Sequence, residues 1–286
     1  MKLEICHVTH YNYADMVSDS VNEVRLSPRT NYRQACYHQH VVTEPAASLF
    51  TYEDFFGNRV HSFTVNKMHK QLKITTTSTV VTHENDNLRR EVLSPEEEWR
   101  WVRSEKFQDQ VAEFLLPTRY VRITEEVMSF ADRLGTDEQG VFGIVNRMME
   151  EIRSEFAYQP KSTNVHSTVE ELFRLKQGVC QDFTHLMLAL CRFKGIPARY
   201  VSGYHFVGDL NSRMAHFEQA SHAWVEAYIP GTGWLGFDPT NNCQVGGRHV
   251  KLGHGRDYHD IVPVKGVYRG TPEQSLHVLV DVRKIG

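Results

Sequence analysis

The 286-residue sequence contains few cysteines and no closely spaced pair of them. The five that are present form no C-x-x-C pair, and their number is odd: Cys6, Cys36, Cys180, Cys191 and Cys243. A disulfide framework is usually dense and even-numbered, so we expect reduced thiols in a reducing compartment. The histidines also lack the spacing of a metal site, and we interpret His249, His254 and His259 as surface or core residues. We therefore expect neither a metal nor another cofactor.

Long apolar runs and blocks of like charge are absent as well. The formal net charge is −3, and no block of five or more like charges occurs, so nucleic acid and anionic membranes are not the expected partners. No segment approaches the ~20 apolar residues of a membrane span, and the N-terminal "MKLEICHVTHYNY" alternates where a signal peptide would be continuously apolar. These features predict a globular cytoplasmic protein.

The pattern of apolar residues divides the chain into two parts. Residues 1 to about 83 are rich in Val, Thr, Tyr and Phe with period-two alternation, which predicts an antiparallel β-sandwich or barrel. From about residue 96 the spacing becomes helical, and strand-like segments return after Pro197. We place the boundary in the polar segment "HENDNLRREVLSPEEE", with an all-β domain at 1–90 and a second domain at 91–286.

The segment "RLKQGVCQDFTHLMLALCRFKGIPARY" places Cys180 immediately before an apolar helical stripe. A thiol at a helix N-terminus lies at the positive end of the helix dipole, where the reactive thiolate is favoured. Cys191, which lies among apolar neighbours further along the helix, is interpreted as a packing residue. Taken alone, Cys180 is equally compatible with a buried structural cysteine.

Downstream, "SHAWVEAYIPGTGWLGFDPTNN" predicts a β-hairpin. If Tyr228 pairs with Trp234, then His222 and Asp238 lie diagonally on one face, and a slip of one residue would separate them. A cysteine nucleophile needs such a base, and the base needs a partner that orients it. Alone, His222 is typical of a half-buried strand residue, and Asp238 before a proline is typical of a turn.

These segments, together with "GRDYHDIVPVKGVYRG", resemble the bacterial transglutaminase-like family, whose members are often described as cysteine proteases. The resemblance covers nearly the whole chain. It implies an α+β fold, in which an N-terminal β-domain precedes a transglutaminase-like core of the papain-like superfamily, with the nucleophile at a helix N-terminus packed on an antiparallel sheet. It also implies Cys180 as nucleophile, His222 as base and Asp238 as orienting acid. The gap from Cys180 to His222 is far shorter than the ~130 to 150 residues of papain-type proteases, which disfavours a true papain relative.

Three further residues are candidates for the acyl pocket or the oxyanion site. Gln181 and Trp224 neighbour the nucleophile and the base in sequence, although a strand tryptophan is more often a core residue. Tyr158 corresponds to an upstream aromatic residue that serves the oxyanion in some transglutaminase relatives.

A site of this kind forms a thioester from an amide or ester and passes the acyl group to water or to an amine. We favour hydrolysis of a peptide, amide or isopeptide bond, because water is always present and an amine site must be built. Acyl transfer to an amine is the first alternative, and a non-catalytic binding or assembly module is the second. The sequence does not predict the substrate or the oligomeric state.

Overall fold

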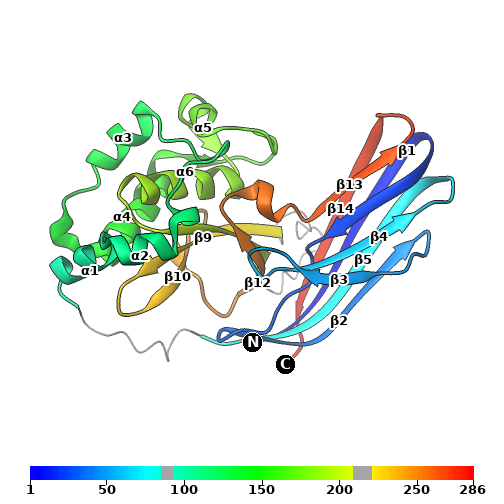
Figure 1. The fold of residues 1–286 in the computed structure, drawn as a ribbon, viewed down its shortest axis with the longest axis horizontal. Helices are drawn as coiled ribbons and strands as arrows, with labels where there is room; N and C mark the ends of the chain where they lie inside the picture. The colour runs from blue at the N-terminus through cyan, green and yellow to red at the C-terminus, as the bar shows by residue number, and fades with distance from the viewer. Residues whose placement is uncertain (85–92, 209–220) are drawn as a thin grey trace.

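The computed structural model describes residues 1–84, 93–208 and 221–286. Two antiparallel sheets and a group of helices make up this part of the chain, with the seven-stranded sheet on the right of Figure 1 and the helices on the left. The α+β class and the antiparallel β fold expected at the N-terminus are confirmed. The expected boundary at residues 90 and 91 lies outside the described residues.

The seven-stranded sheet is organised around one long strand, β1 (Lys2–Val24). Its first half pairs with β5 and β14, and its second half pairs with β4 and β13. The register shifts between Asn12 and Val17 and again between Ser18 and Val21, so the sheet curls where β1 changes partners. The other strands are β2 (Gln34–Glu44), β3 (Phe50–Glu53), β4 (Arg59–Val65), β5 (His69–Thr82), β13 (Val264–Arg269) and β14 (Gln274–Lys284).

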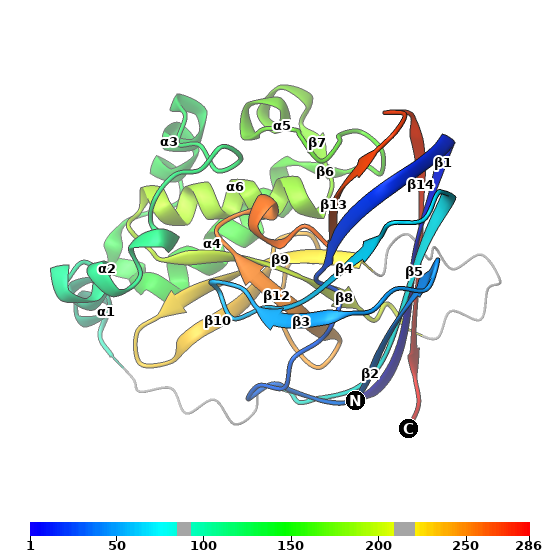
Figure 2. The same ribbon diagram turned by 45° about the vertical axis from the view of Figure 1, so that its right-hand side comes forward.

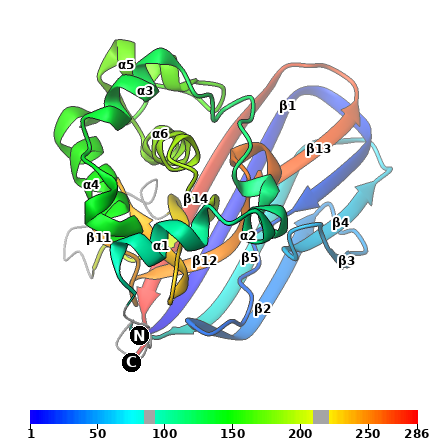
Figure 3. The same cartoon turned by 60° about the vertical axis from the view of Figure 1, so that its left-hand side comes forward.

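The last two strands correct the expected domain division. Strand β14 pairs with β1 from Leu3↔Lys284 to Tyr13↔Gln274, and the two lie side by side in Figures 1 and 3. Residues 264–284 therefore belong to the N-terminal sheet, whereas the expected boundary at residues 90 and 91 had placed them in the second domain. Alternation along β14 predicts a strand, but it carries no information about which distant strand will be its neighbour.

The middle of the chain forms the helices and the five-stranded sheet. The sheet has the order β11-β10-β9-β8-β12. Its strands are β8 (Ala198–His205), β9 (Ser221–Ile229), β10 (Gly233–Asp238), β11 (Cys243–Gln244) and β12 (His249–Gly255). The helices are α1 (Pro95–Val102), α2 (Glu105–Gln110), α3 (Glu125–Asp132), α4 (Gly140–Glu155), α5 (Val169–Leu175) and α6 (Cys180–Phe193), with short 3-10 turns η2 (Ala112–Phe114), η3 (Asp137–Gln139) and η5 (Tyr258–Ile261). None of these described helices has the length and apolar composition needed to cross a lipid bilayer.

Helix α6 is the central element of the helical layer. It packs on β8 and β9 and is contacted by α3, α4 and α5, which surround it in the end-on view of Figure 3. Residues Phe183 to Leu190 are buried, and Cys191 is fully buried with its sulfur 3.7 Å from that of Met148, as expected for a packing residue. Strand β9 turns Ala223 and Val225 toward this core, so the alternate residues point to the opposite face.

That opposite face of the five-stranded sheet meets the seven-stranded sheet, as Figure 2 shows. Tyr204 and Phe206 at the end of β8, with Val250 and Leu252 of β12, complete the apolar core of the N-terminal sheet. The two sheets therefore share a core, although no described strand of residues 1–84 joins the five-stranded sheet. Apolar side chains of both sheets are buried in this shared core, and this burial stabilises the contact between the β-domain and the five-stranded sheet.

This packing predicts that β14 contributes to folding stability through Val280. Val280 is 2% exposed, whereas Val278 on the same strand is 42% exposed. Val280→Thr should lower the free energy of unfolding by about 1–3 kcal/mol, because it buries a hydroxyl group. Val278→Thr, the matched control, should change it by less than about 0.5 kcal/mol. Urea unfolding followed by circular dichroism measures both, and equal effects would contradict the assignment of β14 to this core.

Candidate active site

Cys180 is the first residue of α6 and follows the N-cap Val179. The Asp182 carboxylate accepts a hydrogen bond from the Val179 N–H at 2.8 Å and another from the Thr163 hydroxyl at 2.6 Å. Asp182 therefore fixes the start of the helix and the loop before it, and the dipole favours a carboxylate there. This local structure holds the Cys180 thiol at the positive end of a 14-residue helix.

The hairpin of β9 and β10 has the register that brings His222 and Asp238 together. Trp234 pairs with Tyr228 and Phe237 with Val225, so the predicted even register is confirmed. His222 Nε2–H donates to Asp238 Oδ2 at 2.7 Å. Cys180 adjoins the same imidazole, and its interaction with the ring contributes to the raised pKa of His222. The three predicted residues thus form one contiguous group.

Asp238 is fully buried and accepts more hydrogen bonds than the sequence predicted. Oδ1 accepts from the backbone N–H groups of Thr240 at 3.0 Å and Asn241 at 3.1 Å. Oδ2 accepts from the Asn241 amide at 2.7 Å and from His249 Nε2–H at 3.0 Å, in addition to His222. Asp238 therefore makes both expected contacts. Oδ1 caps the turn expected for an aspartate before a proline, and Oδ2 makes the contact with His222 expected for a triad.

Hydrogen bonding sets the charges of this group. Burial would raise the pKa of Asp238, but the hydrogen bonds from His222 and His249 hold it well below its usual range. Burial would lower the pKa of His222, but the hydrogen bonds to Asp238 and Cys180 outweigh this effect and raise it to about 10. His222 is therefore an imidazolium at neutral pH, placed beside a thiol at a helix N-terminus. An adjacent imidazolium favours the thiolate.

His249 is a residue of this site whose role the sequence did not predict. Its Nδ1 accepts a hydrogen bond from the Gly246 N–H at 3.3 Å, so the neutral ring carries its proton on Nε2, toward Asp238. Burial lowers its pKa, in agreement with a neutral imidazole. The spacing of His249 from Asp238 follows no local rule, because β12 lies on the far side of β8 from β9. Asn241, in contrast, could have been found as the end of the "DPTNN" turn.

One cluster in the described ranges has the composition of a metal site. Ligand atoms of His222, Asp238 and His249 lie within 4.8 Å of one another. Both imidazoles, however, donate N–H groups to the same oxygen, Asp238 Oδ2. A metal ion would have to replace these hydrogen bonds, so the group is better described as a carboxylate shared by two histidines.

The three weaker candidates occupy different surroundings. The short parallel strands β6 (Ala157–Tyr158) and β7 (Gln177–Gly178) pair Tyr158 with Gly178, just before Cys180. Burial and the nearby Cys180 raise the pKa of Tyr158 to about 12, so its hydroxyl keeps its proton. The Gln181 amide donates to the Val165 carbonyl at 3.2 Å and so fixes a loop. Trp224 packs edge-on against His249, with ring centroids 5.3 Å apart.

Comparison with known proteins gives two adjacent family matches. Residues 129–239 match the transglutaminase-like superfamily, and residues 3–81 match the bacterial transglutaminase-like N-terminal region. A protein of Mycobacterium leprae is 34% identical over 99% of both chains, and a protein of Mycobacterium tuberculosis is 32% identical over 98% of this chain and 92% of its own length.

Two further similarities concern proteins whose names refer to an activity. A protein-glutamine gamma-glutamyltransferase of Pseudomonas aeruginosa is 33% identical over 118 residues, which are 39% of this chain and 18% of that protein. The crystal structure of a proposed cysteine protease from Cytophaga hutchinsonii has a TM-score of 0.75 at 23% identity and covers 100% of this chain and 92% of its own. At this identity the second similarity shows the fold.

The site geometry predicts that Cys180 reacts first with a thiol alkylator at neutral pH. Burial raises the pKa of Cys36, raises that of Cys243 to about 11 and raises that of Cys191 to about 12. These thiols should label slowly, and Cys191 should label last. Iodoacetamide labelling followed by peptide mass spectrometry measures the order.

The same measurement separates the role of His222 from that of other histidines. His222→Ala should slow the labelling of Cys180, because the imidazolium that favours the thiolate is lost. His40→Ala, a change in β2 far from the thiol in sequence, should leave the rate unaltered. Faster labelling of Cys6 than of Cys180, with no effect of His222→Ala, would show that the two residues do not act together.

Proposed function

Because this chain belongs to the bacterial transglutaminase-like family, we propose that it is a cysteine-dependent hydrolase of amide or isopeptide bonds. The observation that carries the proposal is the position of the His222 ring, which is hydrogen-bonded to Asp238 and adjoins Cys180, the first residue of α6. Nucleophile, base and orienting acid are the three parts that thiol acyl chemistry requires. We assign the catalytic roles to these three residues.

In the proposed first step the Cys180 thiolate attacks the carbonyl carbon of the substrate amide. The carbonyl oxygen gains negative charge, and the N-terminal end of α6, with the protonated Tyr158 hydroxyl beside it, is suited to stabilise that charge. The imidazolium of His222 then donates its Nδ1 proton to the leaving nitrogen as the C–N bond breaks. An amine departs, and the acyl group remains on sulfur as a thioester.

In the second step neutral His222 acts as the base. It takes a proton from a water molecule, whose oxygen attacks the thioester carbonyl, and the C–S bond breaks to release a carboxylic acid. The Cys180 thiolate and the His222 imidazolium are then restored, so all protons balance. Throughout, Asp238 keeps Nε2 protonated and the ring oriented, because its oxygens accept hydrogen bonds and cannot donate one.

A cleft lies at the start of β9, the strand that carries His222. It has a volume of about 510 Å³, and Ser221, the residue before His222, forms part of its wall together with Tyr258. The opposite wall is supplied by the seven-stranded sheet, through residues of β1 and β14: His7, Thr9, Tyr11, Leu276, Val278 and Val280. We propose that the substrate segment beside the reacting amide lies here, which would give the β-domain a part in substrate selection.

Acyl transfer to an amine is the competing function. The similarity to a protein-glutamine gamma-glutamyltransferase, although it covers 39% of this chain, favours acyl transfer over a non-catalytic binding module. The two reactions share the thioester and differ only in the acceptor. Cytoplasmic location and a peptide or amide substrate remain predictions.

The proposal predicts hydrolysis as the main outcome when acceptors compete. The protein should be incubated with a mixture of glutamine-containing and lysine-containing peptides, with and without an added primary amine, and the products analysed by mass spectrometry. Cleaved or deamidated peptides that are absent with Cys180→Ala would support a hydrolase. Amine adducts that outnumber hydrolysed products would favour the transferase. If hydroxylamine traps no acyl-enzyme, a binding module would be favoured.

A second prediction concerns Asp238→Asn, measured as turnover of a substrate from that mixture. Both Asp238 oxygens accept from N–H groups, so the asparagine NH₂ would face a donor in either orientation, and the charge that favours the imidazolium would be lost. In a serine protease the matching change cost about 10⁴ in turnover. A cysteine is more acidic than a serine, so we expect a loss on the order of 10 to 10³ here. Circular dichroism should confirm that the variant is folded, and unchanged turnover would remove Asp238 from the mechanism.

A further inference from the structure

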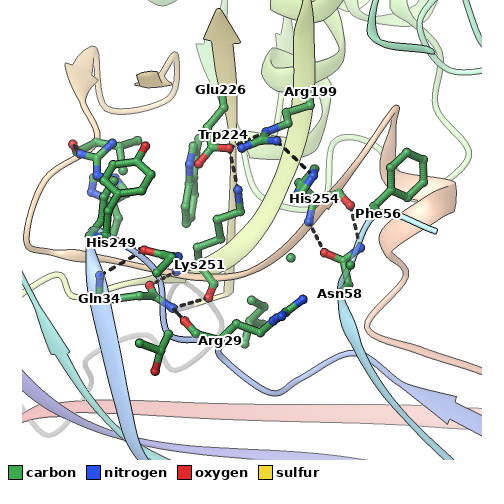
Figure 4. A pocket seen from close by; sticks show the side chains of 18 of the residues that line it. Arg29, Gln34, Phe56, Asn58, Arg199, Trp224, Glu226, His249, Lys251 and His254 are labelled. Atoms are coloured by element: carbon green, nitrogen blue, oxygen red, sulfur yellow. Dashed lines mark hydrogen bonds and ion pairs between the residues drawn. The ribbon is translucent and has the colours of Figure 1, made fainter. Parts of the chain in front are cut away.

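A second cavity lies on the face of the five-stranded sheet that is turned toward the β-domain. It has a volume of about 230 Å³ and is bounded by β8, β9 and β12 on one side and by the 29–34 and 56–58 segments of the β-domain on the other. Figure 4 shows its side chains converging from both parts of the chain. The cleft next to Ser221 is lined by different residues, so the two hollows are distinct.

Two cations and one carboxylate face this cavity from the sheet. Arg199 Nε–H donates to Glu226 Oε2 at 2.7 Å, and the Lys251 ammonium donates to the same oxygen at 2.6 Å. The side chains of Arg199, Lys251 and Glu226 are only 15%, 18% and 6% exposed. Buried charges are normally balanced by partners. This group holds two cations and one anion, and Arg29 and Arg33 of the β-domain also line the cavity, so cations outnumber anions in the described lining.

Neighbouring histidines add no further charge to this group. His254 Nε2 lies 3.1 Å from Arg199 Nη1, and burial together with the charges of Lys251 and Arg199 lowers the pKa of His254 to about 2. His249, which also lines the cavity, is a neutral imidazole whose pKa is lowered by burial. Among the described residues, Glu226 is the only acidic side chain in the lining, and Lys251 and Arg199 hold its pKa well below its usual range against the effect of burial.

The cavity walls are held in place by two side-chain amides of the β-domain. Gln34 donates to the Lys251 carbonyl and accepts from the Lys251 N–H, both at 2.8 Å. Asn58 likewise donates to the His254 carbonyl at 2.7 Å and accepts from the His254 N–H at 2.8 Å. A Cβ at Gly253 would lie 2.5 Å from Asn58 Oδ1, so glycine is needed for this close approach. A pocket fixed in this way requires little reorganisation when a ligand binds.

Part of the lining is apolar and is supplied by Phe56, Trp224, Val245 and Leu252, beside the polar Thr30, Asn31 and Tyr32. A site in which cations outnumber anions and part of the wall is apolar matches an anion that carries a hydrocarbon body. The volume lies below the ~300 Å³ at which sites for drug-sized ligands begin. We propose that this cavity binds a small organic carboxylate, whose negative charge pairs with Arg199 and Lys251 and whose apolar part packs on Trp224 and Phe56.

The position of the cavity links such a ligand to the candidate active site. His249 lines the cavity, and its Nε2–H donates to the same Asp238 oxygen that orients His222. Trp224 also lines the cavity. Its ring centroid lies 6.2 Å from that of His222 and 5.3 Å from that of His249. A bound carboxylate would thus contact the side chains that hold the triad in place, and it would not contact the Cys180 thiol.

Titration calorimetry of the wild-type protein tests the proposal at constant ionic strength. Benzoate should bind saturably, and benzamide, its neutral counterpart of similar shape, should bind at least about tenfold more weakly, the effect of a lost charge-assisted contact. Inorganic phosphate should bind more weakly than benzoate, since it has no apolar part. Equal binding of benzoate and benzamide, no benzoate binding, or phosphate binding in preference to benzoate would each overturn the proposal.

Two variants with opposite expected effects on benzoate affinity test whether benzoate binds in this cavity. Lys251→Met leaves Arg199 and Glu226 balanced and should weaken benzoate binding by roughly 10- to 100-fold, the effect of a lost charge-assisted hydrogen bond. Glu226→Gln removes the carboxylate of this group and should tighten benzoate binding. General destabilisation would weaken binding in both, so parallel losses would contradict the assignment. Lys73→Met, which removes a surface cation paired with Glu44, is the matched control and should have no effect.

Discussion

The hydrogen bonds of the buried Asp238 carboxylate hold the candidate active site together. A charged group without access to water is costly unless every lone pair is satisfied, and Asp238 meets this condition with donors from two histidines, one amide side chain and two backbone N–H groups. One oxygen fixes the turn that ends β10, and the other fixes His222 and His249. The charge that orients the base is therefore the same charge that organises the junction of β9, β10 and β12.

The local part of this arrangement could be predicted from the sequence. The alternation of His222 and Trp224 with Ala223 and Val225, and the position of the Pro-Gly-Thr-Gly turn, determine which residues share a face of the hairpin. The apolar stripe that follows Cys180 likewise predicts where α6 begins. In both cases the deciding interactions lie within about 20 residues of chain, so a period and a turn suffice.

The parts that could not be predicted depend on contacts between distant segments. His249 reaches Asp238 only because β12 pairs with β8, and β14 joins β1 across nearly the whole length of the chain. Alternation is the same for a strand whichever neighbour it has, so a pattern identifies strands without identifying their partners. The excess of cations around Glu226 could not be predicted for the same reason, since Arg199, Glu226 and Lys251 come from three strands.

The long strand β1 gives the chain an order of assembly. Its first half has β5 on one side and β14 on the other, and β14 is synthesised long after β5. On the ribosome, β1 and β5 can pair early, while the β14 side of β1 remains an open sheet edge until β14 has been made. An open edge of this kind is a site of unwanted association, so the newly made β-domain is exposed to aggregation until β14 covers that edge.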